Sequence, residues 1–120
     1  MTPPTRNARL LAEFLGTAFL IIAVVGSGIM ASRLSPTDIG LQLFENAAAT
    51  AGALVGLILM FGAVSGAHFN PVVSFVDALF GDLSWSDFGL YAVVQTAGGC
   101  FGSIIANLMF SLDAVNISHH

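Results

Sequence analysis

The stretch SGAHFNPVVS occupies residues 65–74 and directly follows a run of apolar residues long enough to lie inside a lipid bilayer. Asn70 is a residue type that commonly precedes the first turn of a helix, because its side-chain oxygen accepts a backbone N–H there. Pro71 follows at the first helical position, where the N–H that proline lacks would have no partner in any case. The stretch therefore predicts a helix over residues 70–80, ended by Gly81.

A helix over residues 70–80 is too short to cross a membrane. About eleven residues at 1.5 Å each measure roughly 16 Å, about half the thickness of a hydrocarbon core. Apolar segments lie on both sides of it, and the stretch SGAHF leads into it. We therefore expect a re-entrant half-helix whose N-terminus lies near the middle of the membrane. Non-helical backbone occurs at that depth only where it is buried in protein or lines a water-filled cavity, so the segment predicts a pore or a polar site.

The composition of the whole chain agrees with a membrane protein. Of its 120 residues 56% are hydrophobic and only 8% are charged, whereas about a quarter of the residues of a soluble domain are charged. The net charge of −4 comes from 3 basic and 7 acidic side chains. The chain therefore has no basic patch that would bind nucleic acid.

Three long apolar spans surround the short helix, over residues 10–31, 41–64 and 88–112. Each is long enough to cross the hydrocarbon core as a helix. The segment GDLSWSDF, residues 81–88, reads as a polar turn before the last span. The predicted fold is a single all-α membrane domain over residues 1–120, with three transmembrane helices and one re-entrant half-helix.

The basic residues predict how the spans are oriented. Arg6 and Arg9 precede the first span and Arg33 lies in the next loop, which favours a cytoplasmic N-terminus. A cleaved signal peptide is the alternative, but the apolar part is longer than such a segment and Ile29 spoils a small-residue cleavage site. We expect a multi-pass protein of the plasma membrane, the inner membrane of the cell.

The start of the short helix predicts what kind of solute could pass. Unpaired N–H groups at a helix N-terminus carry a partial positive charge, which repels cations in a low-dielectric setting. The Asn70 amide can donate a hydrogen bond to a solute. The backbone carbonyls before it can accept hydrogen bonds; they belong to Gly66, Ala67, His68 and Phe69. The expected cargo is small, uncharged and hydroxyl-bearing.

Three motifs together resemble the first half of an aquaporin or aquaglyceroporin, of the major intrinsic protein family. They are AEFLGT at residues 12–17, SGAHFNP at residues 65–71 and YAVVQTAGG at residues 91–99. The resemblance implies a passive channel for water and glycerol, built from two inverted repeats of which this chain holds one. It also implies a tetramer and no cofactor.

The resemblance further implies roles for single residues. Asn70, Pro71 and Val72 match the first Asn-Pro-Ala box, so Asn70 is the expected solute-contacting amide. Glu13 matches a buried glutamate that braces the re-entrant loop, although a lone acid near a helix end can also simply reach the interface. Thr50 matches a residue of the outer selectivity constriction, although a threonine in a membrane helix commonly just bonds its own i−4 carbonyl.

The stretch around Thr50 is similar to a bacterial subgroup associated with arsenic resistance, which implies passage of neutral arsenite-type acids as well. Val72 departs from the family pattern, because a β-branched side chain replaces alanine and is expected to shift packing or narrow the lumen. The second box and the constriction arginine are absent. The pore would therefore need a second channel half or another copy of the chain.

Several alternatives stay open at the level of the sequence. The chain could be a piece of a full-length channel, a half-size protein that pairs with itself in antiparallel fashion, or a non-conducting structural subunit. An enzyme is not expected, because no nucleophile and base surround His68 with the character of a catalytic triad. A metal site is not expected either, because His68 with Glu13 or Asp77 falls short of the usual number of ligands.

Small and amide side chains in the spans predict helix packing. Gly98, Gly102 and Ala106 recur four apart, as do Gly52 and Gly56, a spacing that lets helix backbones approach closely in lipid. Gln95 and Asn107 are expected to hydrogen-bond between helices.

Overall fold

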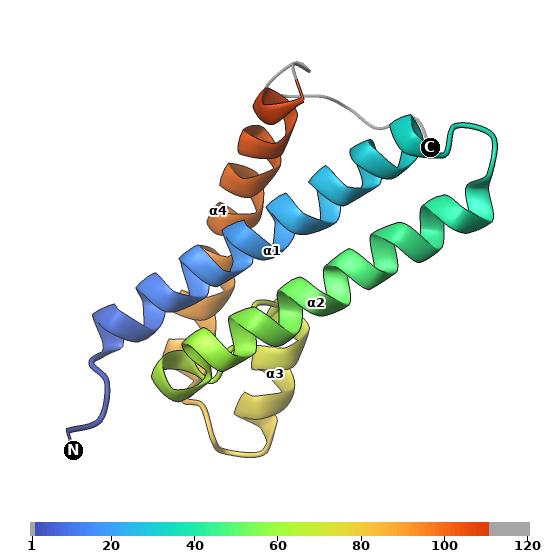
Figure 1. The fold of residues 1–120 in the computed structure, drawn as a ribbon. Helices are drawn as coiled ribbons and strands as arrows, with labels where there is room; N and C mark the ends of the chain where they lie inside the picture. The colour runs from blue at the N-terminus through green and yellow to red at the C-terminus, as the bar shows by residue number, and fades with distance from the viewer. Residues whose placement is uncertain (1, 111–120) are drawn as a thin grey trace.

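A computed structural model describes residues 2–110 of the protein. That part of the chain forms four helices and no strand (Figure 1). They are α1 (Arg6–Leu34), α2 (Ile39–Ser65), α3 (Pro71–Leu79) and α4 (Trp85–Met109). Three of them, α1, α2 and α4, are long and apolar enough to cross a membrane. The predicted all-α class, with three spanning helices and one short helix, is confirmed.

The helices begin where polar side chains cap them. Thr5, Asp38, Asn70 and Ser84 each precede a helix, and the side chain of each accepts a backbone N–H from the first turn. Such caps satisfy N–H groups that have no partner inside the helix. In each case the capping residue is of a type that favours this position, so the local sequence accounts for where the chain turns into a helix.

The observed helices differ from the predicted spans at their ends. α1 starts four residues before the predicted span, because Thr5 caps it. The predicted polar turn over residues 81–88 was wrong in its second half, because Ser84 accepts the Asp87 N–H and α4 already begins at Trp85. Residues 111 and 112 of the predicted last span lie outside the described residues.

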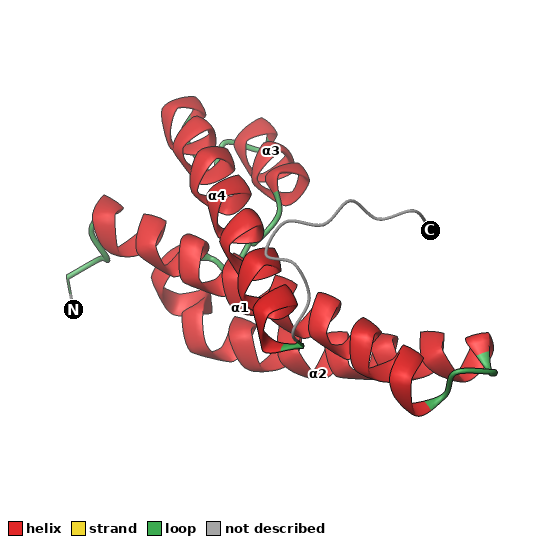
Figure 2. Ribbon diagram, turned by 90° about the horizontal axis from the view of Figure 1, so that it is seen from above, coloured by secondary structure: helices red, strands yellow, loops and turns green. Residues whose placement is uncertain are grey.

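Helix α1 is the element against which the others are arranged. It packs along α2 on one side and along α4 on the other, while α3 packs against α4 (Figure 1). Seen from above, α3 and the N-terminal part of α4 lie together, to one side of the α1 and α2 pair (Figure 2). Among the described helices, the short helix is therefore held by α4.

Two glycines let α4 approach α1 closely. A Cβ placed on Gly98 would lie 2.5 Å from the carbonyl oxygen of Phe14, and one on Gly102 would collide with the carbonyl oxygen of Ala18. Gly52 and Gly56 behave differently, since a Cβ on either would meet nothing within 4 Å. Within the described residues, close helix packing thus rests on the glycines of α4 and not on those of α2.

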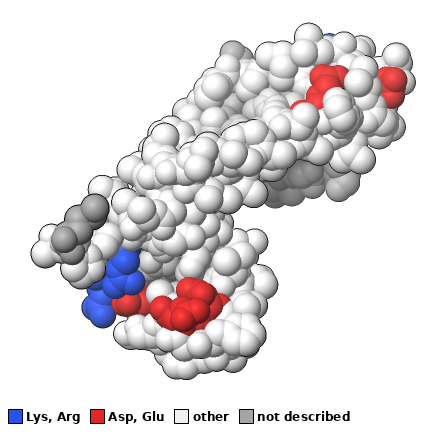
Figure 3. Space-filling model, turned by 60° about the horizontal axis from the view of Figure 1, so that its bottom comes forward, with Lys and Arg blue, Asp and Glu red and all other residues white. Residues whose placement is uncertain are grey.

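Charged side chains tie the beginning of α1 to the beginning of α4. Asp87 lies 3.0 Å from the Nε of Arg6 and 3.0 Å from an Nη of Arg9. Basic and acidic side chains lie next to each other at one end of the molecule, and much of the visible surface beyond them carries no charge (Figure 3). This distribution suits helices that cross a membrane, with charges confined to the ends.

The two sets of glycines should respond in opposite ways to alanine. We expect Gly102→Ala to lower the free energy of unfolding by about 1–3 kcal/mol, because the added methyl group overpacks the α1 contact. Gly52→Ala should instead stabilise the protein by up to about 1 kcal/mol, because alanine favours a helix and meets no neighbour there. Unfolding in detergent micelles, followed by circular dichroism, measures both. Equal effects of the two substitutions would contradict the proposed difference in packing.

Candidate functional site

The segment between α2 and α3 departs from helical geometry directly after Ser65. Gly66 ends α2 with a φ of 89°, and the non-glycine residues Ala67 and Phe69 also have positive φ, at 53° and 54°. Such conformations cost on the order of 1–3 kcal/mol each and persist only where the surroundings hold them. The loop over residues 66–69 must therefore be fixed by other parts of the molecule.

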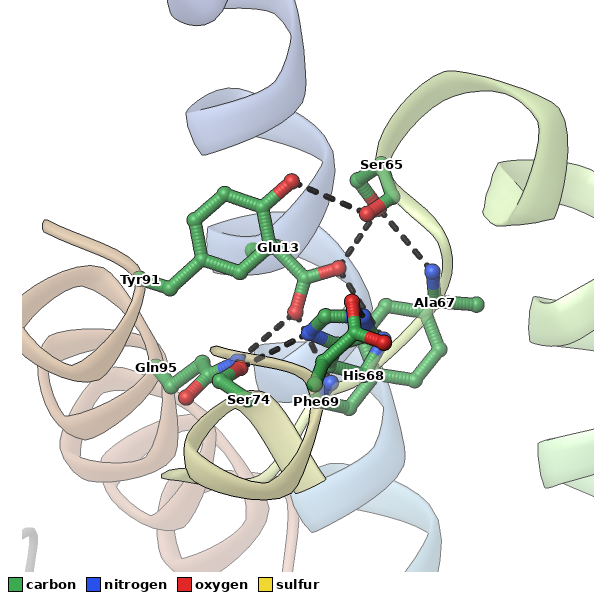
Figure 4. A network of polar contacts seen from close by, with 9 residues as sticks. Glu13, Ser65, Ala67, His68, Phe69, Ser74, Tyr91 and Gln95 are labelled. Carbon is green, nitrogen blue, oxygen red and sulfur yellow. Dashed lines mark hydrogen bonds and ion pairs between the residues drawn. The ribbon is translucent and has the colours of Figure 1, made fainter. Parts of the chain in front are cut away.

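Glu13 of α1 supplies that support. Its Oε2 accepts the backbone N–H of His68 at 3.1 Å, and its Oε1 accepts that of Phe69 at 2.8 Å (Figure 4). Ser65 Oγ donates to the same carboxylate at 2.5 Å, and Gln95 Nε2 donates to it at 2.8 Å. The side chain is fully buried, and all four partners are donors. Four donors suit an ionised carboxylate, which only accepts hydrogen bonds.

The same contacts leave the carbonyl side of the loop open. Two of the loop's amides are bonded to Glu13, whereas no hydrogen bond to a carbonyl oxygen of residues 66–69 is found in the described part of the chain. These four oxygens, called the open carbonyl oxygens, therefore have no hydrogen-bond partner within the described residues. Each carbonyl oxygen can accept up to two hydrogen bonds.

Asn70 lies at the point where the loop becomes α3. Its backbone is extended, with φ −154° and ψ 127°, and its Oδ1 accepts the N–H of Val72 at 2.8 Å. Pro71 occupies the first helical position. The side-chain NH₂ of Asn70 makes no hydrogen bond within residues 2–110, and the residue is exposed. Asn70 thus presents a free donor next to the open carbonyl oxygens.

The His68 ring lies on the side of α3 and α4. Its Nδ1 is 2.8 Å from Ser74 Oγ, its Nε2 is 3.2 Å from Asp77 Oδ2, and its centroid is 5.3 Å from that of the Tyr91 ring. The ring therefore links the loop to α3. Its backbone carbonyl, and not its imidazole, belongs to the open row of acceptors.

Sequence reasoning missed most of the residues that complete this network. Tyr91 donates its hydroxyl to the Ser65 carbonyl at 2.9 Å, and Gln95 donates both to Glu13 and to Ser74, at 3.0 Å for the latter. Gln95 was expected only to join helices. The available signal was spacing, because Tyr91, Gln95, Gly98 and Gly102 follow one another at helical intervals and all four are buried.

Phe69 fixes the other side of the loop. Its ring is 5% exposed and fills the position that a side chain on Gly16 would need. The ring also meets Phe61 of α2 edge-on, at a centroid distance of 6.2 Å. The motif at residues 12–17 therefore supplies two parts of the loop's support, the carboxylate of Glu13 and the space beside Gly16.

Thr50 lies apart from the loop, on α2. Fifteen residues separate it from Ser65, about 23 Å along a helix. Its hydroxyl donates to the side-chain oxygen of Asn46 at 3.2 Å. The structure brings Glu13, the loop and Asn70 together as one site, whereas Thr50 belongs to a second polar site.

A buried carboxylate, a non-helical loop inside the span region and a half-length helix define a membrane protein with a re-entrant segment. The chain matches the model of the family described as Major intrinsic protein over residues 2–119. It therefore belongs to the major intrinsic protein family, as the motifs predicted.

Named relatives agree with this assignment. The aquaglyceroporin AqpS of Rhizobium meliloti (strain 1021) is 48% identical over 110 residues, which cover 92% of this chain and 47% of that protein. Aquaporin NIP1-4 of Oryza sativa subsp. japonica is 37% identical over 102 residues, covering 84% of this chain and 36% of that protein. Aquaporin-9 of Rattus norvegicus is 36% identical over 93 residues, covering 78% and 31% respectively. No solved structure matches the chain.

The assignment places the chain among multi-pass membrane proteins of a channel family, and not among enzymes. The chain spans less than half the length of the relatives that it matches. The loop and half-helix described above lie within the matched part.

The carboxylate of Glu13 should be needed to hold the loop. In Glu13→Gln one oxygen becomes an NH₂ group that cannot accept, so at least one of four donors loses its partner, at a cost of about 1–3 kcal/mol. We expect faster hydrogen exchange at the His68 and Phe69 amides in detergent micelles, measured by mass spectrometry.

Glu45→Gln provides a matched control, because Glu45 accepts a hydrogen bond from Ser35 and does not contact the loop. This variant should leave exchange at residues 66–69 unchanged. Unaltered protection of the two loop amides in Glu13→Gln would contradict the support role of the carboxylate.

Proposed function

We propose that the chain forms one half of a passive transmembrane channel for small uncharged solutes. The observation that carries this proposal is the loop over residues 66–69, of which two amides are bonded to Glu13 while its carbonyl oxygens have no partner within the described residues. A row of unpaired acceptors is costly in lipid and is tolerated where it faces water or a passing solute. Relatives named as aquaporins and an aquaglyceroporin support the same function.

In this proposal the solute passes between the open carbonyls and the start of α3. Glu13 holds the loop, and Pro71 and Val72 form the first turn of the half-helix. The Asn70 NH₂ donates to the solute oxygen. The hydroxyl groups of the solute donate to the backbone carbonyls of Gly66, Ala67, His68 and Phe69. The partial positive charge at the N-terminus of α3 repels cations and spares neutral molecules.

The proposed cargo is water, glycerol and neutral arsenite-type acids. Thr50 is the proposed constriction residue on α2, because a threonine there leaves more room and more polarity than an aromatic ring. Val72 is proposed to narrow the lumen near the box, since its side chain is β-branched and 67% exposed. The 48% identity with an aquaglyceroporin supports glycerol as a cargo.

The channel requires a partner that completes the wall. We infer that this partner is a second channel half or another copy of the chain, because one repeat leaves the loop carbonyls and the exposed face of α3 without protein cover. We further propose that completed channels assemble into a tetramer, as the resemblance to the family implies. The proposed location is the plasma membrane, with the N-terminus, Arg6 and Arg9 on the cytoplasmic side.

Stopped-flow light scattering on proteoliposomes tests the proposed function directly. Vesicles containing the 120-residue chain should shrink and swell faster than empty vesicles in water and glycerol gradients. Acceleration by the chain alone would mean that copies of the chain complete the pore for one another. Folded protein that accelerates neither solute would exclude a self-completed pore and would favour a requirement for a separate second half.

A bulky residue at the constriction should lower the permeability for glycerol and not the permeability for water. Thr50→Phe is expected to reduce glycerol permeability by about tenfold or more, a barrier increase of about 1.4 kcal/mol, and to spare water. The same light-scattering assay gives both rates on one preparation. Unchanged glycerol permeability would remove Thr50 from the proposed constriction.

A further inference from the structure

A second polar cluster lies between α1 and α2, away from the loop. Asn46 Oδ1 accepts the Thr50 hydroxyl at 3.2 Å and lies 3.3 Å from the Ser27 hydroxyl of α1. Asn46 and Thr50 stand about 10 Å and 16 Å along α2 from its first residue, so both are inside the span. Polar side chains at such depths either hydrogen-bond between helices or line a solute pathway.

The Thr50 hydroxyl is held in an unusual direction. A threonine in a helix commonly donates to the carbonyl oxygen four residues before it, as Thr96 does to Ala92 at 2.8 Å. Thr50 instead donates to the side chain of the residue four before it. Because a hydroxyl has one proton, the Thr50 oxygen keeps only its lone pairs for any other partner, and it acts as an acceptor.

Asn46 contributes the complementary group. Its Oδ1 accepts the Thr50 hydroxyl and lies near the Ser27 hydroxyl, whose one proton also reaches the Val24 carbonyl oxygen at 3.2 Å. The NH₂ of Asn46 makes no hydrogen bond within the described residues. The NH₂ lies beside Gly28, at 3.0 Å from the position that a Cβ on this glycine would take. Both Asn46 and Thr50 are partly exposed. The pair thus offers a donor and an acceptor one helical turn apart.

We propose that Asn46 is a specificity-determining residue that acts through Thr50. This inference rests on the proposed function, in which Thr50 belongs to the constriction. Because Asn46 Oδ1 accepts the hydrogen bond of the Thr50 hydroxyl, the threonine oxygen can act only as an acceptor for a solute O–H. The NH₂ of Asn46 donates to a neighbouring solute oxygen. Polyols and neutral hydroxo acids carry hydroxyl groups close enough together to use both, whereas a single water molecule uses one at a time.

The ratio of glycerol to water permeability measures this role in proteoliposomes of the full chain. Asn46→Leu and Thr50→Val each remove one partner while keeping a similar size. Each should lower the ratio roughly two- to tenfold, the factor that one neutral hydrogen bond contributes. The double variant should lower it by less than the product of the two single effects, because both changes disrupt the same pair.

Two matched controls separate this role from helix packing. Ser27→Ala removes the hydrogen bond of Asn46 to α1 but leaves the Thr50 bond, and Thr96→Val removes a hydroxyl that is bonded to its own helix. Both should leave the ratio unchanged. A loss in Ser27→Ala equal to that in Asn46→Leu would overturn the proposal, since Asn46 would then act only as a tie between helices. Additive losses in the double variant would overturn it as well.

A spectroscopic measurement tests the hydrogen bond without transport. In the folded chain, the NMR signals of the Asn46 side-chain amide should shift in Thr50→Val and stay in place in Thr50→Ser, which keeps the hydroxyl. Equal shifts in both variants, or none, would overturn the proposal even if the channel conducts. Wild-type vesicles that move neither solute would instead exclude the self-completed channel of the proposed function, and the NMR signals would still test the Asn46–Thr50 pair.

Discussion

The structure depends on one buried carboxylate. Glu13 accepts hydrogen bonds from the end of α2, from two loop amides and from α4, so a single side chain of α1 joins α2, the re-entrant loop and α4. A buried charge is tolerated only when its hydrogen bonds are complete. The positive φ angles of the loop are stable because these bonds hold them.

The position of the carboxylate depends in turn on how closely α4 approaches α1. Gly98 and Gly102 allow that approach, which brings Gln95 within 2.8 Å of Glu13 and Tyr91 within 2.9 Å of the Ser65 carbonyl. Gly16 makes room for Phe69 in the same way. Small residues in the spans therefore serve the polar network as well as the packing, because a wider separation would leave donors and acceptors unpaired inside the membrane.

The outer surface shows where the molecule is incomplete on its own. α2 and α3 leave large apolar side chains exposed, among them Leu59 at 81% and Val72 at 67%. Lipid can cover the apolar face of α2. The start of α3 also exposes Asn70 and lies beside the open loop carbonyls, groups that lipid cannot satisfy. A partner chain is therefore needed most at the half-helix, where it would have to satisfy these polar groups.

The sequence alone determined the elements, because their signals are local: apolar runs of sufficient length, capping residues such as Asn70 and Ser84, and Pro71 at a helix start. The motifs at residues 12–17, 65–71 and 91–99 also predicted the family, and the first of them directed attention to Glu13. Only the tertiary structure decided which polar atoms meet. Gln95 and Tyr91 lie far from Glu13 along the chain, and Asn46 had no motif to mark it. Their roles follow from distances between helices, which hydropathy and spacing do not encode.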